Sequence, residues 1–91
     1  MTQDIVLPQK IDHSAIEHLV EQLKRHHDQP VRVDMSQSKG VGGLASQVLL
    51  AAMRKWRTDN LTFEFATSEA VEADLSRLGL LDEMQSREED T

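Results

Sequence analysis

Three stretches of this chain alternate apolar and polar residues with the period of a β-strand, and a stretch with helical periodicity follows each of them. The strand-like stretches are residues 4–7, 31–35 and 61–65. The helical stretches are residues 14–27, 43–57 and 68–78. Strands separated by helices of this length favour βαβ units. We therefore predict a small α/β domain with a four-stranded, mostly parallel sheet and three to four helices, in which residues 9–12 are the weakest strand.

Polar residues and a glycine mark where these helices begin and end. Ser14 opens a sequence with capping-box spacing, so the first helix is expected to begin there and to end near His27. Ser68 is expected to cap the third helix at its N-terminus. Gly79 followed by Leu80 predicts a Schellman-type end for that helix.

Length and composition limit the class of protein. A length of 91 residues predicts one domain, over residues 1–85, followed by an acidic tail over residues 86–91. The chain carries a net charge of −6 and no cysteine. The negative charge argues against nucleic acid as a partner. The absence of cysteine excludes disulfides and cysteine-based metal sites. No apolar run is long enough to cross a membrane and no signal peptide is recognisable, so we expect a cytoplasmic protein without direct membrane insertion.

No group of residues has the spacing of a catalytic or metal site. The four histidines are His13, His18, His26 and His27, and no pair has the i, i+4 spacing of a helical metal site. The serines Ser36, Ser38 and Ser46 lie outside any G-x-S-x-G motif. The loop Gly40–Gly43 matches neither phosphate-binding glycine motif, and a tight turn explains it better. We therefore expect no enzyme, no metal and no cofactor.

The helix expected at residues 43–57 is apolar almost all the way round. Ser46 and Gln47 are the only polar residues between Leu44 and Met53, whereas a surface helix normally has one apolar stripe. A domain of this size cannot cover both sides, so one side is expected to meet a partner. The expected core stripe is Ala45, Val48, Leu49, Ala52 and Trp56. The expected partner-binding surface is Gly42, Gly43, Ser46, Gln47, Leu50, Met53, Arg54 and Arg57.

Three parts of this expectation have alternatives. Leu50 and Met53 are expected to be exposed on that surface, but they would also suit packing against a neighbouring helix. Together with Lys55, Arg54 and Arg57 form a basic cluster that would also stabilise the C-terminal end of the helix through its dipole. Trp56 is expected to cap the core, with an exposed contact residue as the alternative.

The order of these motifs resembles the STAS domain, the family that includes the anti-sigma factor antagonists. The likeness extends over residues 4–82 and depends on three short sequences: Val33-Asp34-Met35-Ser36, the run Val48–Ala52 and Leu78-Gly79-Leu80. The run Val48–Ala52 with Trp56 is also similar to STAS proteins of bacterial chemotaxis operons. The resemblance implies a STAS-like fold and a non-enzymatic interaction module of bacterial signalling. Its implied partner is a GHKL-type ATPase or histidine-kinase domain of an anti-sigma factor or a chemotaxis kinase.

The chain departs from the family at the residue that partner kinases phosphorylate. Members carry Asp-Ser-Ser-Gly at the start of the second helix. When Leu49 and Leu50 are aligned to the family's two adjacent aliphatic residues, Gly43 and Leu44 take the places of the two serines. This position is therefore a degenerate phosphosite, and the usual phosphoserine switch is expected to be absent. Two alternative functions remain: a STAS subunit of an ABC-type lipid transporter, and a nucleotide-sensing domain that uses Gly40–Gly43.

Overall fold

The fold is a three-stranded parallel sheet with three helices. The computed structural model describes residues 2–80. Its elements in chain order are β1 (Gln3–Val6), α1 (His13–Arg25), β2 (Val31–Met35), α2 (Gly43–Thr58), β3 (Phe63–Thr67) and α3 (Glu69–Arg77). The strands lie in the order β1-β2-β3 and both neighbouring pairs are parallel. The α/β class and the parallel pairing expected from the sequence are confirmed.

Residues 9–12 contain no strand, so the described sheet has three strands and not the expected four. This segment connects β1 to α1, and the Gln9 carbonyl accepts a hydrogen bond of 2.8 Å from the backbone N–H of Lys39, which lies in a loop. A single loop contact replaces the ladder of hydrogen bonds that would define a strand. The acidic tail expected at residues 86–91 lies outside the described residues.

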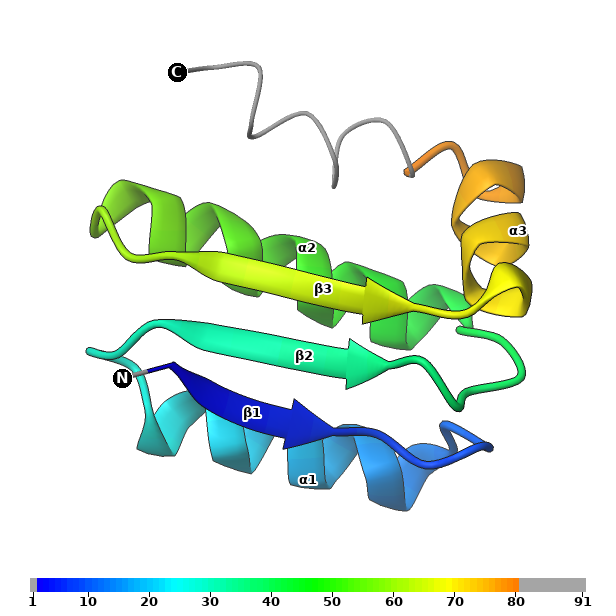
Figure 1. Cartoon of the computed structure of the whole chain (residues 1–91), viewed down its shortest axis with the longest axis horizontal. Helices are drawn as coiled ribbons and strands as arrows, with labels where there is room; N and C mark the ends of the chain where they lie inside the picture. The colour runs from blue at the N-terminus through cyan, green and yellow to red at the C-terminus, as the bar shows by residue number, and fades with distance from the viewer. Residues whose placement is uncertain (1, 81–91) are drawn as a thin grey trace.

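The two faces of the sheet differ. Helices α1 and α2 cover one face, and α3 lies at the end where the strands finish (Figure 1). Ile5 and Val33 pair in register with Phe65 on the covered face. Asp4 and Arg32 pair in register with Glu64 on the other face. The alternation of apolar and polar residues in the sequence therefore corresponds to the helix-covered and the open face of the sheet.

The N-cap of helix α1 lies two residues earlier than the capping-box pattern predicts. Asp12 is the N-cap residue, and its carboxylate accepts a hydrogen bond of 3.0 Å from the backbone N–H of Ala15. Ser14 is the second residue of the helix and is exposed. Aspartate caps as well as serine does, and Asp12 stands the right distance from a free N–H group, so it takes the position expected for Ser14.

The ends of α3 agree with the sequence. Ser68 caps its N-terminus by accepting a hydrogen bond from the Val71 N–H. Gly79 has a φ of 75°, a backbone conformation that favours glycine. The N–H of Leu80 donates to the Leu75 carbonyl at 2.8 Å and that of Gly79 to the Ser76 carbonyl at 3.0 Å. This pair of bonds defines a Schellman end and confirms the prediction.

Trp56 lies inside the core, as the favoured interpretation predicted. Its side chain is buried, and its indole N–H donates a hydrogen bond of 2.7 Å to the Gln29 carbonyl. Its ring packs edge-on against Phe63 at a centroid distance of 5.4 Å, and Phe63 packs similarly against Phe65. This aromatic row joins α2 to β3 and fixes the C-terminal half of α2 on the sheet.

Candidate functional site

The start of α2 lies at the end of the sheet where the strands finish, beside α3 (Figure 1). Gly42 is the N-cap residue of α2 and provides no side-chain hydrogen bond to the first turn. Gly42 and Gly43 are exposed, and a Cβ atom added at either would meet no atom within 4 Å. Leu44 is 60% exposed. The consecutive residues Gly42, Gly43 and Leu44, which belong to the expected partner surface or to the degenerate phosphosite, are therefore all exposed.

Three other residues of the expected partner surface are buried. Ser46 and Met53 are fully buried and Leu50 is only 6% exposed. The expectation that Leu50 and Met53 are exposed is therefore wrong, and the alternative of internal packing is the one that the structure shows. Both side chains belong to the same core cluster as Val71 and Leu75 of α3.

The observed core-facing side of α2 differs from the expected one by a rotation about the helix axis. The residues of α2 that face the core are Ala45, Ser46, Leu49, Leu50, Met53 and Trp56. The centre of this arc lies roughly 70° from the stripe expected from the sequence, at 100° per residue. Val48 and Ala52, which were assigned to the core, are half-buried. Because apolar residues surround the helix, their pattern alone could not fix which side faces inward.

The exposed side of α2 is consequently a different stripe. Leu44, Gln47, Ala51 and Arg54 are exposed and follow one another at helical spacing; we call these four residues the outer face of α2. Gln47 and Arg54 belong to the surface expected from the sequence, whereas Ala51 does not. Arg57 is half-buried, and its Nε and Nη2 atoms are buried without a hydrogen-bond partner in the described part of the chain.

The loop that leads into α2 is held by side chains from distant parts of the sequence. Ser38 is buried and its hydroxyl donates to the Pro8 carbonyl at 2.7 Å. The Ser68 hydroxyl donates to the Ser38 carbonyl at 2.6 Å. The Asp74 carboxylate accepts a hydrogen bond of 2.8 Å from the Val41 N–H. The start of α2 is thus fixed from two sides, by the loop after β1 and by α3.

Sequence reasoning missed Asp74 as part of this arrangement. One of its carboxylate oxygens bonds the Val41 N–H, and the other accepts from Arg77 at 2.7 Å. A Cβ atom added at Gly40 would lie 2.6 Å from the Asp74 carboxylate. The glycine is therefore needed for the close approach of this side chain. The charge pattern within α3 gave no signal for a partner 33 residues earlier in the chain.

Asp34, at the end of β2, belongs to the sequence motif that resembles the STAS domain. Its carboxylate accepts hydrogen bonds from the Ser36 hydroxyl at 2.6 Å and the Ser36 N–H at 2.9 Å. Chiefly the hydroxyl, and then the N–H, lower the pKa of Asp34 below its ordinary value. The carboxylate therefore stays ionised and shapes the turn after β2, a structural task that needs no catalytic role.

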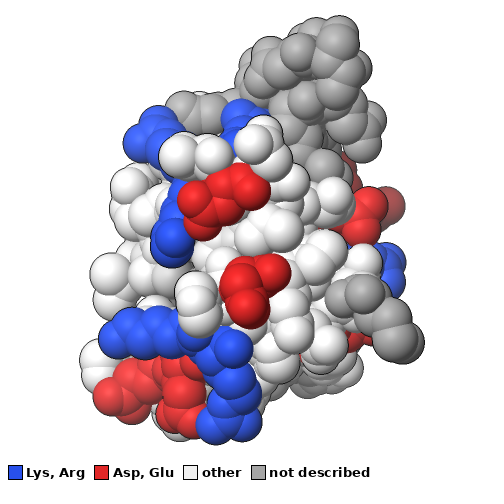
Figure 2. Space-filling view, turned by 90° about the vertical axis from the view of Figure 1, so that its left-hand side faces the viewer, with Lys and Arg blue, Asp and Glu red and all other residues white. Residues whose placement is uncertain are grey.

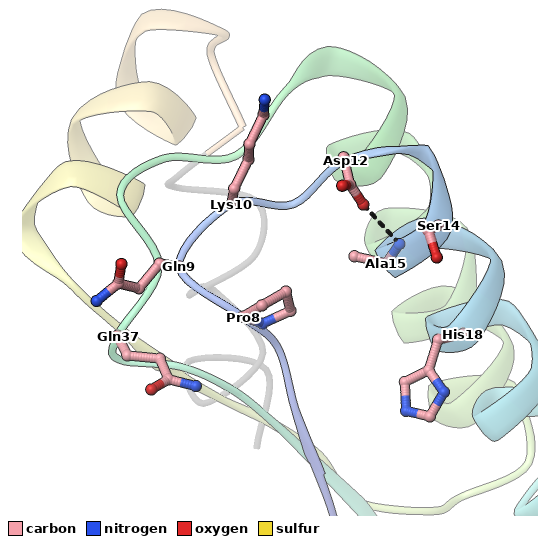
Figure 3. Close-up of a pocket in the computed structure, with 8 residues that line it drawn as sticks. All are labelled: Pro8, Gln9, Lys10, Asp12, Ser14, Ala15, His18 and Gln37. Atoms are coloured by element: carbon pink, nitrogen blue, oxygen red, sulfur yellow. Dashed lines mark hydrogen bonds between the residues drawn. The ribbon is translucent and has the colours of Figure 1, made fainter.

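A hollow of about 800 Å³ lies between the loop after β1 and the first turns of α1 (Figure 3). Its polar groups already serve the local structure. Asp12 caps α1, and the Gln37 amide donates to the Leu7 carbonyl at 2.9 Å. His18 lines the same hollow from α1. Ser14 lines it too, one helical turn before His18, and no hydrogen bond joins these two side chains in the described structure.

A second hollow of about 440 Å³ lies between α1 and α2 and is mainly apolar; we call it the α1–α2 groove. Its apolar lining consists of Val20, Leu23, Val48, Ala51, Ala52 and Trp56. Lys24, His27 and Lys55 complete the lining. One member, Ala51, also belongs to the outer face of α2, so the groove and that face are continuous.

The described residues contain neither a metal cluster nor a membrane-spanning helix. Within residues 2–80, no three His, Asp or Glu side chains are grouped so that they could hold a metal ion. None of the helices in the same range is long and apolar enough to cross a membrane.

At the end of the molecule where the strands begin, positive and negative side chains are interspersed (Figure 2). This end lacks the continuous basic patch that typifies nucleic-acid binding.

Comparisons of the chain with family models, with curated proteins and with solved structures found no match in any of the three.

Proposed function

We propose that this chain is a non-enzymatic, STAS-like interaction module of bacterial signalling that binds a GHKL-type ATPase or histidine-kinase domain. The proposal is supported by the sequence resemblance and by one structural observation. Leu44, which takes the place of the family's phosphorylated serine, is a large apolar side chain that is 60% exposed. This exposed apolar side chain, next to the accessible backbone of Gly42 and Gly43, is available for contact with a partner.

The proposed contact surface is the outer face of α2 together with Gly42 and Gly43. It keeps four residues of the surface inferred from the sequence: Gly42, Gly43, Gln47 and Arg54. Ser46, Leu50 and Met53 are removed from direct contact because they are buried. A partner that sits on Leu44 and Gln47 would also cover the two glycines, which leave the backbone accessible.

The module is proposed to work without a phosphoserine switch. In a switch of this kind, phosphate adds a charge of about −1.5 to −2 and disrupts a packed interface. Neither Gly43 nor Leu44 carries a hydroxyl. The nearest alternative, Ser46, is fully buried, and its hydroxyl donates to the Gly42 carbonyl at 2.9 Å. Because a kinase needs an accessible hydroxyl, Ser46 is a poor substitute.

A nucleotide-sensing role for Gly40–Gly43 has less support. The Val41 N–H in this loop is already bonded to the Asp74 carboxylate. A phosphate placed there would compete with this carboxylate and would be repelled by its charge. The role of a transporter subunit shares the proposed contact surface and differs in its partner.

Binding to purified GHKL-type ATPase domains from the same genome, measured by isothermal titration calorimetry, tests the proposal. Leu44→Glu is the informative variant, because it replaces the large apolar side chain of the proposed surface with a charge without touching the core. We expect at least about a tenfold loss of affinity, the usual effect of removing a central apolar contact. Val6→Glu is the control, because it makes the same kind of change at an apolar residue that is 53% exposed in β1, and it should bind as the wild type does. Equal binding of the wild type and Leu44→Glu would contradict the proposed surface.

A further inference from the structure

The α1–α2 groove has features that neither the family resemblance nor the proposed surface at the start of α2 accounts for. Its floor is formed by Leu23 and Trp56, and Ala51 and Ala52 leave room above it because their side chains are small. From Val48 to Trp56 the groove follows α2 for roughly 12 Å, or two helical turns, at 1.5 Å per residue. This length suits two turns of a partner helix laid between α1 and α2.

The charges around the groove are positive. Lys24 on α1 and Lys55 on α2 line it, and no acidic side chain does. Lys24 has no ion-pair partner for its amino group among residues 2–80, and Lys55 pairs with Asp59 at 2.9 Å. This lining is unusual in a chain with 16 acidic and 10 basic residues. An apolar floor with lysines at its edges is complementary to an apolar stripe flanked by carboxylates.

We infer that the α1–α2 groove binds an acidic amphipathic helix of a partner protein. The partner's apolar side chains would enter the space above Ala51 and Ala52, and its carboxylates would pair with Lys24 and Lys55. His27 lies on the same rim, with its Nδ1 3.2 Å from the Lys24 carbonyl. This inference takes from the proposed function only that the domain binds another protein, and it does not depend on that protein being a kinase.

The chain carries its own probe for this test. Trp56 is the single tryptophan of the sequence and lines the groove. A tryptophan-free synthetic peptide of about 15 residues, long enough to form a helix on binding, would carry leucines on one face and glutamates beside them. A second peptide would carry lysines in place of the glutamates. Titration of each into the full chain is followed by Trp56 fluorescence and by backbone amide NMR shifts.

We expect the acidic peptide to bind with saturable changes at Trp56 and in amides of α1 and α2, and the basic peptide to bind at least about five-fold more weakly. Lys24→Glu should lower the affinity for the acidic peptide by a similar factor. Ala51→Leu should abolish binding by filling the groove. Lys39→Glu makes the same charge change in the loop before α2, away from the groove, and should bind as the wild type does.

Three results would overturn the inference. The first is equal binding of the acidic and the basic peptides. The second is an equal loss of affinity in Lys24→Glu and Lys39→Glu. The third is self-association in sedimentation experiments that Ala51→Leu abolishes, because a second copy of the chain would then occupy the groove. A failure here leaves the effect of Leu44→Glu on ATPase-domain binding unchanged, so the two proposals fail separately.

Discussion

The Asp74 carboxylate accepts a hydrogen bond of 2.8 Å from the backbone N–H of Val41, 33 residues earlier in the chain. This bond connects α3 to the loop that begins α2, so it positions the first turn on which the proposed surface depends. Gly40 allows it, because a Cβ atom there would lie 2.6 Å from the same carboxylate.

Replacing either member of this arrangement should destabilise the fold. Asp74→Ala leaves the Val41 N–H without its partner, which costs about 1–3 kcal/mol of unfolding free energy. Gly40→Ala should destabilise as well, because its methyl group displaces the Asp74 carboxylate. Gly43→Ala is the matched control, since its methyl group meets open space and alanine favours a helix. Urea denaturation measures all three; a Gly40→Ala protein as stable as Gly43→Ala would contradict this account.

The burial of Leu50 separates two substitutions that look alike in sequence. Leu50→Glu forces a charge into the core and should reduce the unfolding free energy by at least about 3 kcal/mol. Leu44→Glu should change it by less than about 0.5 kcal/mol, because Leu44 is exposed and an acidic residue suits the first turn of a helix. Thermal unfolding followed by circular dichroism compares them. Similar melting temperatures would show that α2 is not rotated as described.

The bonds from Ser36 to Asp34 predict a pH dependence. A carboxyl group whose pKa is lowered by folding adds stability above its unfolded-state pKa and loses it as the pH falls through the folded-state pKa. Ser36→Ala removes the hydroxyl and should raise the pKa of Asp34 toward its ordinary value, while the backbone N–H keeps part of the effect. The stability difference from the wild type should be full at neutral pH and vanish in acid.

An NMR titration of the Asp34 carboxyl carbon, with urea denaturation at neutral and acid pH, checks both statements. Ser76→Ala in α3 is a suitable control, because it removes an exposed hydroxyl away from Asp34. An unchanged Asp34 pKa in Ser36→Ala would be inconsistent with the hydroxyl as the main cause.

The indole of Trp56 should contribute through its hydrogen bond as well as its packing. Trp56→Phe leaves the Gln29 carbonyl without its donor and loosens the contact with Phe63, at a cost of about 1–3 kcal/mol. Gln29→Ala keeps that carbonyl and removes only the contact of 3.1 Å between the Gln29 Oε1 and the His26 Nδ1, so it should cost less, about 0.5 kcal/mol. Chemical denaturation of the two proteins compares them, and the reverse order of stabilities would exclude the hydrogen bond as a significant contribution.

Features that depend on neighbouring residues could be predicted from the sequence. The bounds of α2, the Ser68 cap and the Schellman end at Gly79 each follow from a pattern within a few residues, and the structure has all three. The cap of α1 shows the limit of such patterns. Asp12 and Ser14 both have side chains that can cap, and only the backbone conformation decides between them.

Features that depend on tertiary packing could not be predicted in this way. Ser46 is expected on the outer surface because it lies off the expected core stripe, but its hydroxyl bonds the Gly42 carbonyl within the helix and the residue is buried. A serine whose hydroxyl is satisfied one turn back can enter a core. The role of Asp74 depends on α3 lying beside the loop before α2, which no local pattern specifies.

The most direct test of the proposed function is the affinity of the wild-type chain for a GHKL-type ATPase domain before and after incubation with Mg-ATP, with intact-mass spectrometry of the chain after incubation. We expect binding with the same affinity in both states and no added phosphate, because Gly43 and Leu44 carry no hydroxyl and Ser46 is buried. Binding that is lost on incubation, together with a mass increase of one phosphate group, would contradict an interaction module without a phosphoserine switch. The absence of binding to any such domain would contradict the proposed partner class.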